Sequence, residues 1–581
     1  MTNLLEAEFP RTLDGLIARF ATPAGRGMRV EAWLFEDAAA RRAGERALAA
    51  HGVTATLRSA YKPVLHALRE EADLRDLAEV LIHTPTHPEG SALRFRLETY
   101  PLAGLLGDVP VRFADGTDEL DYEAVITKRS GERVTHRIFA PNRIRPDHLG
   151  KPTLSSTGWL RVWRPGSTAP DEDGPLETEY EVAFHAIMAA VMAHDWGNAS
   201  PCFETLDIAV ETGGIEERLP YQDECVSTRE ALHEDLYFSI LEVFQRHFGL
   251  AAGDRGLQPG QIIPDIRAGN GPTKLRVALL PPVARPIAGD PGETLAEASR
   301  PLTPARIQAE LASLGGHGFT ATSVQGRLVL AAQFPGSGPG ILVSAGQHAN
   351  ETSGVVGALR AAPLLQARGV NFALIPQENP DGYALHYRLR EANPGHMHHA
   401  ARYTALGDDL QVRKSEPFYE KAARLEAFRR IGAQLHINLH GYPAHEWTRP
   451  LTDYVPRGFA PWTIPKGFFL ILRHAAGLAE MADAFIRALT ARVSQTPGLR
   501  AFNDRHIATY LAHGEPLTVP VYDGIPCMVS QSDDQDVPMT LITEYPDETI
   551  YDDAFRLAHT TQMATVLAAA EIFLAGGGIQ I

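Results

Sequence analysis

The sequence predicts an α/β fold, because short apolar runs typical of strands occur along the chain together with segments that have helical apolar spacing. Three of the apolar runs, residues 341–351, 434–442 and 539–545, contain His348, His440 and Glu544 at or near their ends. In open α/β sheets, ligands bind beyond the carboxyl ends of the strands. We therefore expect a functional site where these runs end.

The first run supplies a histidine and a carboxylate. His348 follows the apolar residues 341–345, and Glu351 comes three residues later, where a helix would begin. A strand end and a helix start point these two side chains at one spot, where a divalent ion could bind. The pair alone is weak support in a chain with 23 histidines, and an exposed helix start remains the alternative interpretation.

The second run offers a third metal ligand. His440 ends it and is followed by Gly441. His436 lies four residues earlier on the same run, where its side chain would be buried in the sheet layer. We therefore expect His440 to complete the set of ligands.

The third run ends in Glu544, which would supply a base. A catalytic zinc ion has three protein ligands and one open position for water. A separate carboxylate is needed to take the proton of that water. We therefore expect Glu544 to be the catalytic base and not a ligand.

At this point the chain resembles the zinc carboxypeptidase family (M14-type metallocarboxypeptidases) over residues 300–581. The resemblance rests on His348-Ala-Asn-Glu351, Asn379-Pro-Asp-Gly-Tyr383, His440-Gly-Tyr442 and Glu544, in this order, and on residues 323–330 as the opening strand. It implies a mixed central sheet flanked by helices, in a catalytic domain that begins near Leu302. It also implies one zinc ion and hydrolysis of a peptide bond.

Departures from the family pattern concern substrate binding. The resemblance gives Arg390 the role of polarising the scissile carbonyl, and Tyr522 that of a substrate-capping tyrosine. The family's Asn-Arg pair, which clamps the free carboxylate of the substrate, is replaced here by Gln411 and Val412. The clamp is therefore missing unless Arg402 or Arg413 has taken it over.

Three functions follow from these residues. The first is a zinc metallocarboxypeptidase that cleaves a peptide. The second is a zinc amidohydrolase or deacylase that acts on a small N-acyl amino acid or conjugate, and the missing clamp favours it. The third is a catalytically inactive binding module, which would require the loss of a ligand or of the base.

Composition excludes other classes. The formal net charge of −17 argues against nucleic-acid and anionic-membrane partners, both of which bind a basic face. The three cysteines form no Cys-x-x-Cys pattern and no paired framework, which favours a reducing compartment and a cytoplasmic location. We expect no signal peptide at the start of the chain and no membrane span, since no run of 18 apolar residues occurs.

The length of 581 residues predicts more than one domain. Helical spacing at 37–50 and 62–81 and strand-like runs at 92–97 and 109–113 predict an α/β accessory region over residues 1–165. A loop or linker is expected at 164–175. Helices at 180–193 and 228–248 predict either a second unit over 176–290 or an extension packed on the catalytic domain. Proline-rich stretches at 280–286 and 301–304 indicate a linker into residues 300–581.

Three other polar stretches have simpler interpretations. Residues 396–399, His-Met-His-His, would form the rim of a pocket or, alternatively, a second metal site. His445 and Glu446 are expected in an exposed turn. Residues 269–274 lack the spacing of a phosphate-binding loop and are expected to form a turn.

Overall fold

The computed structural model describes residues 2–282 and 292–579, and its largest element is a nine-stranded mixed sheet. The strands lie in the order β17 (His317–Thr322), β18 (Leu328–Phe334), β20 (Val370–Ile375), β19 (Ser337–Ala345), β21 (Ala433–Pro443), β25 (Met539–Glu548), β22 (Phe469–His474), β24 (Ile525–Gln531) and β23 (Val521–Tyr522). Strands β20, β19, β21 and β25 are parallel, whereas β22 runs antiparallel to β25.

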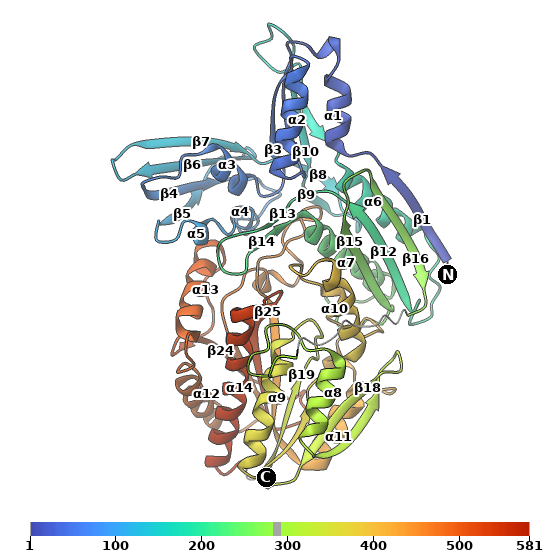
Figure 1. Cartoon of the computed structure of the whole chain (residues 1–581), viewed down its shortest axis with the longest axis vertical. Coiled ribbons are helices and arrows are strands. Elements are labelled where there is room, and N and C mark those ends of the chain that lie inside the picture. The colour runs from blue at the N-terminus through green and yellow to red at the C-terminus, as the bar shows by residue number, and fades with distance from the viewer. Residues whose placement is uncertain (1, 283–291, 580–581) are drawn as a thin grey trace.

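Helices cover both faces of this sheet (Figure 1). One face packs on α8 (Pro304–Ser313), α9 (Ser353–Ala367), α12 (Ala479–Val493) and α14 (Asp552–Ala575), and the other face packs on α11 (Lys421–Ile431). Side chains alternate along β19, so that Ile341 and Val343 enter the core with α9 while Leu342 enters the core with α11. The predicted mixed central sheet flanked by helices is confirmed.

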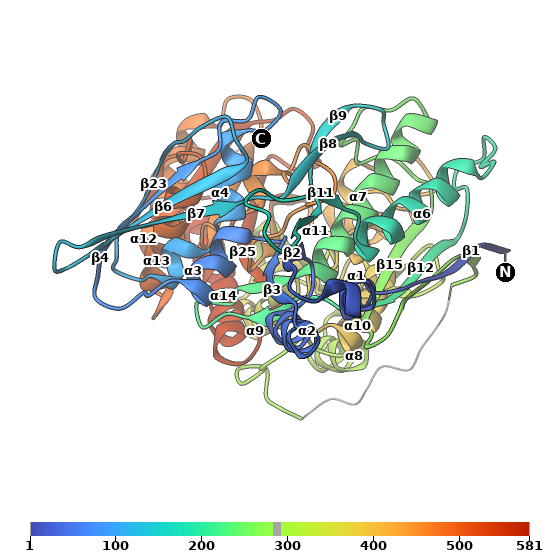
Figure 2. The same ribbon diagram turned by 90° about the horizontal axis from the view of Figure 1, so that it is seen from above.

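The N-terminal half contains three four-stranded sheets. The first sheet consists of β1 (Thr2–Phe9), β16 (Thr273–Leu280), β12 (Thr205–Thr212) and β15 (Gln261–Ala268). The second sheet consists of β11 (Glu172–Leu176), β10 (Gly158–Trp163), β2 (Arg29–Leu34) and β3 (Thr54–Ser59). The third sheet consists of β5 (Val111–Asp115), β4 (Leu77–Thr84), β6 (Asp121–Lys128) and β7 (Arg133–Phe139). The third sheet projects to one side of the molecule, and the first lies on the opposite side (Figures 1 and 2).

Two of these sheets join segments that are distant in the sequence. β1 pairs with β16, so the first residues of the chain lie beside residues 273–280. β10 pairs with β2, so residues 158–163 lie beside residues 29–34. β10 also pairs with β11 across residues 164–171, which form the predicted loop, although β11 itself begins at Glu172. The three-part division at residues 165, 176–290 and 300 stays a prediction. Residues 283–286 of the predicted linker lie outside the described residues.

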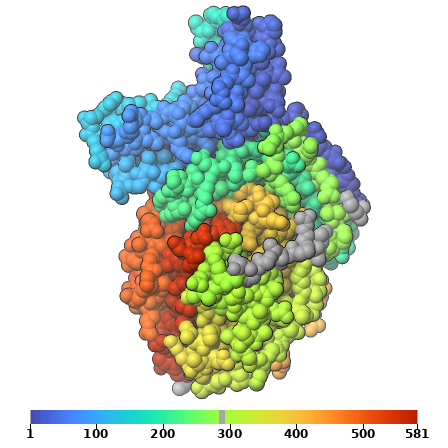
Figure 3. Space-filling view, viewed as in Figure 1, coloured from blue at the N-terminus to red at the C-terminus, as the bar shows by residue number. Residues whose placement is uncertain are grey.

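Helix α7 (Thr228–His247) connects the two halves of the molecule. Every residue from Thr228 to Glu242 is buried, although many of them are charged. Apolar side chains of α7 share one core with the first sheet and with residues of the C-terminal half, among them Trp447 and Phe459. In the space-filling view, the green residues near 200–280 lie between the blue N-terminal region and the rest of the molecule (Figure 3).

Most of the predicted helices are present. Residues 37–50 form α2 (Ala38–Ala50), residues 180–193 lie in α6 (Glu179–Ala193), and 228–248 correspond to α7, with Phe248 as the C-cap. The strand expected at 109–113 is β5, two residues later. Residues 269–272 connect β15 to β16, as the predicted turn requires.

Two predictions in the N-terminal region are wrong. Residues 92–97 form a helix, α4 (Ala92–Glu98), because Ser91 caps its first turn and Arg94 pairs with Glu98 one turn later at 2.9 Å. Residues 62–81 divide into α3 (Pro63–Glu71) and strand β4, which begins at Leu77.

The opening strand expected at 323–330 begins later, as β18 at Leu328, because residues 323–327 form the turn from β17. Among the residues that the structure describes, no helix has the length and apolar character needed to cross a membrane.

Candidate metal centre

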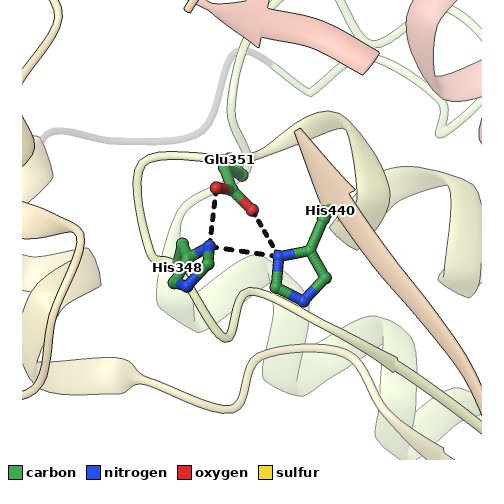
Figure 4. Close-up of side chains that lie close together, drawn as sticks. All are labelled: His348, Glu351 and His440. Atoms are coloured by element: carbon green, nitrogen blue, oxygen red, sulfur yellow. Dashed lines mark hydrogen bonds and ion pairs between the residues drawn. The ribbon is translucent and has the colours of Figure 1, made fainter. Parts of the chain in front are cut away.

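His348, Glu351 and His440 converge on one point, where His348 and Glu351 follow the end of β19 and His440 lies near the end of β21 (Figure 4). His348 Nδ1 lies 2.7 Å from Glu351 Oε1, and His440 Nδ1 lies 2.9 Å from Glu351 Oε2. The two Nδ1 atoms are 3.1 Å apart. No other group of three His, Cys, Asp or Glu side chains with this proximity occurs in the described part of the chain.

Local backbone geometry explains this convergence. The chain leaves β19 through Gly346, whose φ of 65° suits a residue without a Cβ, and the backbone N–H of Glu351 then donates to the carbonyl of His348 at 3.2 Å. This turn brings both side chains of the His-x-x-Glu pair to the same side. At the end of β21, a side chain on Gly441 would overlap Asp547, so glycine is required next to His440.

Further contacts orient the three side chains. His348 Nε2 lies 3.4 Å from Asp409 Oδ2, and the backbone N–H of Gly441 donates to Glu351 Oε2 at 3.0 Å. Arg402 Nη1 donates to Glu351 Oε1 at 2.9 Å. Outer carboxylates of this kind fix the orientation of a ligating histidine and the nitrogen that it presents.

The electrostatics of the cluster favour ligation. Burial alone would raise the pKa of Glu351, but the charges of His348, His440 and Arg402 outweigh it and lower this pKa well below its usual range. Burial lowers the pKa of His440, although Glu351 partly offsets this shift. Glu351 is therefore ionised, which is the form of a carboxyl group that binds a metal.

Glu544 faces the same site from the neighbouring strand. It lies directly opposite His440 in the parallel pairing of β21 with β25, and it is 8% exposed. Burial and the charge of Glu351 raise the pKa of Glu544 well above its usual value, while Arg402 and Lys466 act in the opposite direction. The side chain therefore has the character of a strong base next to the three ligands.

Two more buried carboxyl groups follow on β25. Ser353 N donates to Asp547 Oδ2 at 2.7 Å, and Asn350 Nδ2 donates to Glu548 Oε2 at 2.7 Å. Burial raises the pKa of Asp547 to about 8 and that of Glu548 well above its usual value. Such a concentration of buried carboxyl groups is costly unless cations compensate it, so the site suits a divalent ion.

Only one of the arginines expected to contact substrate lies at the ligand cluster. Arg402 contacts Glu351 there, as described above. Arg390 lies elsewhere: its guanidinium packs over the rings of Tyr387 and Tyr551 and lines a cavity of about 300 Å³ that none of the three ligand residues lines. Because α10 (Pro380–Ala392) directs Arg390 into this cavity, the structure does not bring it to the scissile bond expected at the metal.

Neither Tyr522 nor Arg413 is positioned as the resemblance implies. Tyr522 lies on the edge strand β23 and accepts a hydrogen bond from the exposed Arg487 at 3.1 Å. Arg413 is engaged by two buried carboxylates, Asp408 at 2.6 Å and Glu420 at 2.8 Å. Its donors are therefore occupied within the protein.

The two other histidine stretches are not at the surface, and the predictions of a pocket rim and an exposed turn are wrong. His398 and His399 are buried, and His399 Nδ1 lies 2.5 Å from Glu234 Oε2 of α7. His445 is also buried and contacts Glu230 at 2.7 Å, while Glu446 pairs with Lys62 at 2.6 Å. Charged partners supplied by the N-terminal half permit this burial, and residue spacing cannot reveal them.

Asp409 is a site residue that the sequence interpretation missed. It follows Asp408 in the stretch where the family carries its Asn-Arg pair, and two adjacent acidic residues there were the available signal. Its carboxylate is buried and accepts from the backbone N–H of Gln411 at 3.0 Å as well as approaching His348.

No protein-family model and no curated protein matches this sequence. Three solved structures that are similar to it are a metallo-carboxypeptidase from Burkholderia cenocepacia, bovine thrombin-activatable fibrinolysis inhibitor in complex with tick carboxypeptidase inhibitor, and murein-tripeptide amidase MpaA from Escherichia coli O157. The first has 14% identity and a TM-score of 0.29, and the match covers 53% of this chain and 76% of that one. The second has 10% identity and a TM-score of 0.31, and the match covers 49% of this chain and 100% of that one. The third has 14% identity and a TM-score of 0.25, and the match covers 47% of this chain and 97% of that one. Similarity at this level supports no functional conclusion, so the function is inferred from the side chains alone.

Proposed function

We propose that this protein is a zinc-dependent hydrolase that cleaves a peptide or amide bond, in the manner of a metallocarboxypeptidase. The observation that carries the proposal is the convergence of His348, Glu351 and His440, with Glu544 opposite His440 on the next strand. Two imidazoles, one ligating carboxylate and one separate carboxylate are the set that hydrolytic zinc sites use.

The donor set fits zinc. Ligand atoms in a tetrahedral zinc site are about 3.3 Å apart, given bonds of about 2.0–2.1 Å. The two Nδ1 atoms are 3.1 Å apart, and His348 Nδ1 and His440 Nδ1 lie 2.7 and 2.9 Å from different oxygens of Glu351, so the distances approach this spacing. Three protein ligands leave a fourth position open, which a catalytic site needs. When bound, zinc would supply a Lewis acid beside Glu544.

Glu544 performs the proton transfers. It accepts a proton from the attacking water as the oxygen of that water forms a bond to the carbonyl carbon. Glu544 then gives the proton to the nitrogen of the leaving amine as the carbon–nitrogen bond breaks. Burial of Glu544 favours the protonated form that exists between these two steps.

Arg402 takes the electrophilic role that the resemblance gave to Arg390. Its Nη1 is held by Glu351, whereas its buried Nε has no hydrogen-bond partner among the described residues. A guanidinium held in this way stabilises negative charge that develops on the carbonyl oxygen.

A zinc amidohydrolase or deacylase for small N-acyl amino acids is the second candidate. The observation that favours it is that the residues at the expected carboxylate clamp have no free charged donor. Gln411 Oε1 accepts from Arg424 at 2.7 Å, Val412 has no charge, and Arg413 is occupied by Asp408 and Glu420. None of these three side chains has a free charged donor for the carboxylate of a peptide.

Metal analysis and a hydrolysis screen test the proposal together. The purified protein is expected to contain about one equivalent of zinc and to hydrolyse members of a panel of peptides and N-acyl amino acids. The Glu544→Gln variant is the control, since it should retain zinc and lose turnover. Turnover of peptides alone favours the carboxypeptidase, and turnover of N-acyl amino acids alone favours the deacylase. A zinc-free protein without hydrolytic activity would refute both.

A further inference from the structure

Lys466 is a buried amine without a carboxylate partner. Its side chain is 9% exposed, and its Nζ donates to the carbonyl of Pro461 at 2.5 Å. No described carboxylate forms an ion pair with it, and among the described acidic groups only Glu544 raises its pKa. Burial lowers the pKa of Lys466 to about 8, so the amine is still mostly protonated at neutral pH.

The loop that carries Lys466 is tied to the metal centre. The backbone N–H of Lys466 donates to the hydroxyl of Tyr442 at 3.0 Å, and that hydroxyl donates to the carbonyl of Gly467 at 2.6 Å. Tyr442 follows His440 by two residues. On the other side, β22 begins at Phe469, which lies opposite Glu544 in the antiparallel pairing with β25. The loop that carries Lys466 therefore contacts the strand of His440 through Tyr442 and leads into β22, the strand that pairs with the strand of Glu544.

Aromatic rings surround the amine. The Nζ lies 5.0 Å from the ring centre of Trp462, 5.1 Å from Phe469, 5.5 Å from Tyr510 and 6.0 Å from Tyr442. These four side chains form an aromatic cage around the amine. Tyr442 and Phe469 also belong to a small apolar cluster with Ile471, separate from the main cores. A single cation thus lies within apolar walls beside the catalytic base.

We propose that Lys466 binds the free carboxylate of the substrate, and that the aromatic cage and its apolar cluster contact an apolar group next to that carboxylate. The inference rests on the proposed hydrolase function and adds a substrate class to it. The substrate is a peptide or N-acyl amino acid whose terminal residue is apolar and whose α-carboxylate is unblocked. Lys466 is a binding residue in this role and takes no part in proton transfer.

The unused donors of the amine support this assignment. An ammonium group has three donors, and Pro461 accepts from one of them. A carboxylate that accepts from the others would form a charge-assisted hydrogen bond in a site with little water. The residues at the expected clamp, Gln411, Val412 and Arg413, cannot make this contact, for the reasons given above. Arg402 is held by Glu351 and is assigned to the carbonyl oxygen, so Lys466 is the cation near Glu544 that remains for the carboxylate.

Binding of a small carboxylate to protein without zinc tests the inference independently of hydrolysis. The probes are 3-phenylpropanoate and its uncharged analogue 3-phenylpropanamide, titrated into chelator-treated protein by calorimetry. Removal of zinc ensures that the metal does not bind the carboxylate. The wild type is expected to bind the acid at least about tenfold more tightly than the amide. The fluorescence of Trp462 in the cage gives a second readout.

Three variants complete the design. Lys466→Met removes the charge and keeps the length of the side chain, so the preference for the acid should disappear. Lys466→Arg keeps the charge and should retain part of the preference. Lys274→Met is the matched control, because Lys274 is an exposed lysine on β16 in the N-terminal half, and it should behave like the wild type. Circular dichroism and zinc content identify any variant that fails to fold.

Several results would overturn the inference. Equal binding of acid and amide by the wild type would do so without any variant, as would a full preference retained in a folded Lys466→Met protein. A change in the pH profile of kcat in Lys466→Met, with the acid preference intact, would instead show that Lys466 acts only on the pKa of Glu544. If the binding preference depends on Lys466 but no substrate is hydrolysed, the proposed function fails while the carboxylate site stands.

Discussion

At the scale of single residues, the centre depends on which nitrogen each histidine presents. His348 and His440 both direct Nδ1 at Glu351. In His348 this leaves Nε2 for Asp409, so one imidazole joins the ligand cluster to an outer carboxylate. A histidine on β21 therefore joins the cluster only if it lies at the right position. His436, also on β21, contacts Ser344 Oγ at 2.8 Å instead of Glu351.

The first prediction uses these two histidines of β21. His440→Ala should lower zinc content sharply, because the remaining two ligands leave the ion poorly held. His436→Ala should keep zinc, although loss of its buried hydrogen bond should cost about 1–3 kcal/mol of stability. Elemental analysis and competition with a chromogenic chelator measure both variants. A full equivalent of zinc with unchanged affinity in His440→Ala would show that the ligand assignment is wrong.

The second prediction concerns the base. Glu544→Gln should retain zinc and lose about 10²–10⁴ in kcat, since it removes a positioned proton-transfer group. Glu548→Gln is the control, because Glu548 lies on the same strand, is also buried and already accepts from Asn350. Steady-state kinetics on the best substrate of the screen compares them. Near-normal kcat in Glu544→Gln together with a collapse in Glu548→Gln would move the role of base to Glu548.

The sequence was informative for side chains on or just after strands. His440 and Glu544 lie within β21 and β25, and His348 follows the end of β19, so the apolar runs themselves mark these positions. Arg402 and Asp409 come instead from the irregular segment between α10 and α11, where no periodicity indicates which way a side chain points. Arg390 lies on α10, and helical spacing could not indicate that this part of the helix lines a separate cavity. The placement of Lys466 in a loop before β22 was equally hidden.

At the scale of elements, α7 is a helix that brings charges into the interior. Along its buried length, Glu230 reaches His445, Glu234 reaches His399, and Glu242 pairs with Arg449 at 2.8 Å. Its apolar spacing predicted a helix but could not indicate burial on all sides, since charged residues normally mark a solvent-exposed face. The partners come from residues 396–399 and 445–449, about 200 positions later in the chain.

The third prediction follows from the His445–Glu230 pair. Burial alone would lower the pKa of His445, but the charge and hydrogen bonds of Glu230 outweigh it and raise this pKa to about 9. The unfolded value is about 6.5, so the pair should stabilise the fold fully below about pH 6.5 and lose that contribution as pH rises through 9. The stability that this pair contributes below pH 6.5 and loses above pH 9 is at most about 3 kcal/mol.

His445→Gln should therefore reduce the decline in melting temperature between pH 6.5 and 9.5. It should not abolish the decline, because burial also raises the pKa of Glu234 to about 8, and deprotonation of a buried acid destabilises the fold in the same range. The control is His317→Gln, a change at an exposed residue of the edge strand β17. Identical pH profiles for the wild type and His445→Gln would show that this pair does not set the pH dependence of stability.

At the scale of the whole molecule, long-range pairing joins what the sequence treats as separate regions. The N-terminal strand β1 completes a sheet with residues 205–280, and α7 shares a core with residues that follow β21. Local spacing contains no information on such contacts, because they depend on the complementarity of two distant surfaces. The strands and helices around the metal centre could therefore be predicted, but their burial against the N-terminal half could not.

The last prediction tests whether the two halves unfold as one unit. Phe238 of α7 is 4% exposed, stacks on Trp447 at 5.2 Å and packs against Phe459 at 5.1 Å, so Phe238→Ala should cost about 3–5 kcal/mol. Met192→Ala, at a residue that is 49% exposed on α6, is the control and should cost little. If the shared core couples the halves, calorimetry should show one transition that moves to lower temperature, and hydrogen exchange should increase in β12 and β21 together. Two transitions, of which Phe238→Ala shifts only the one that involves residues 2–282, would mean that the C-terminal half holds its metal centre together without α7.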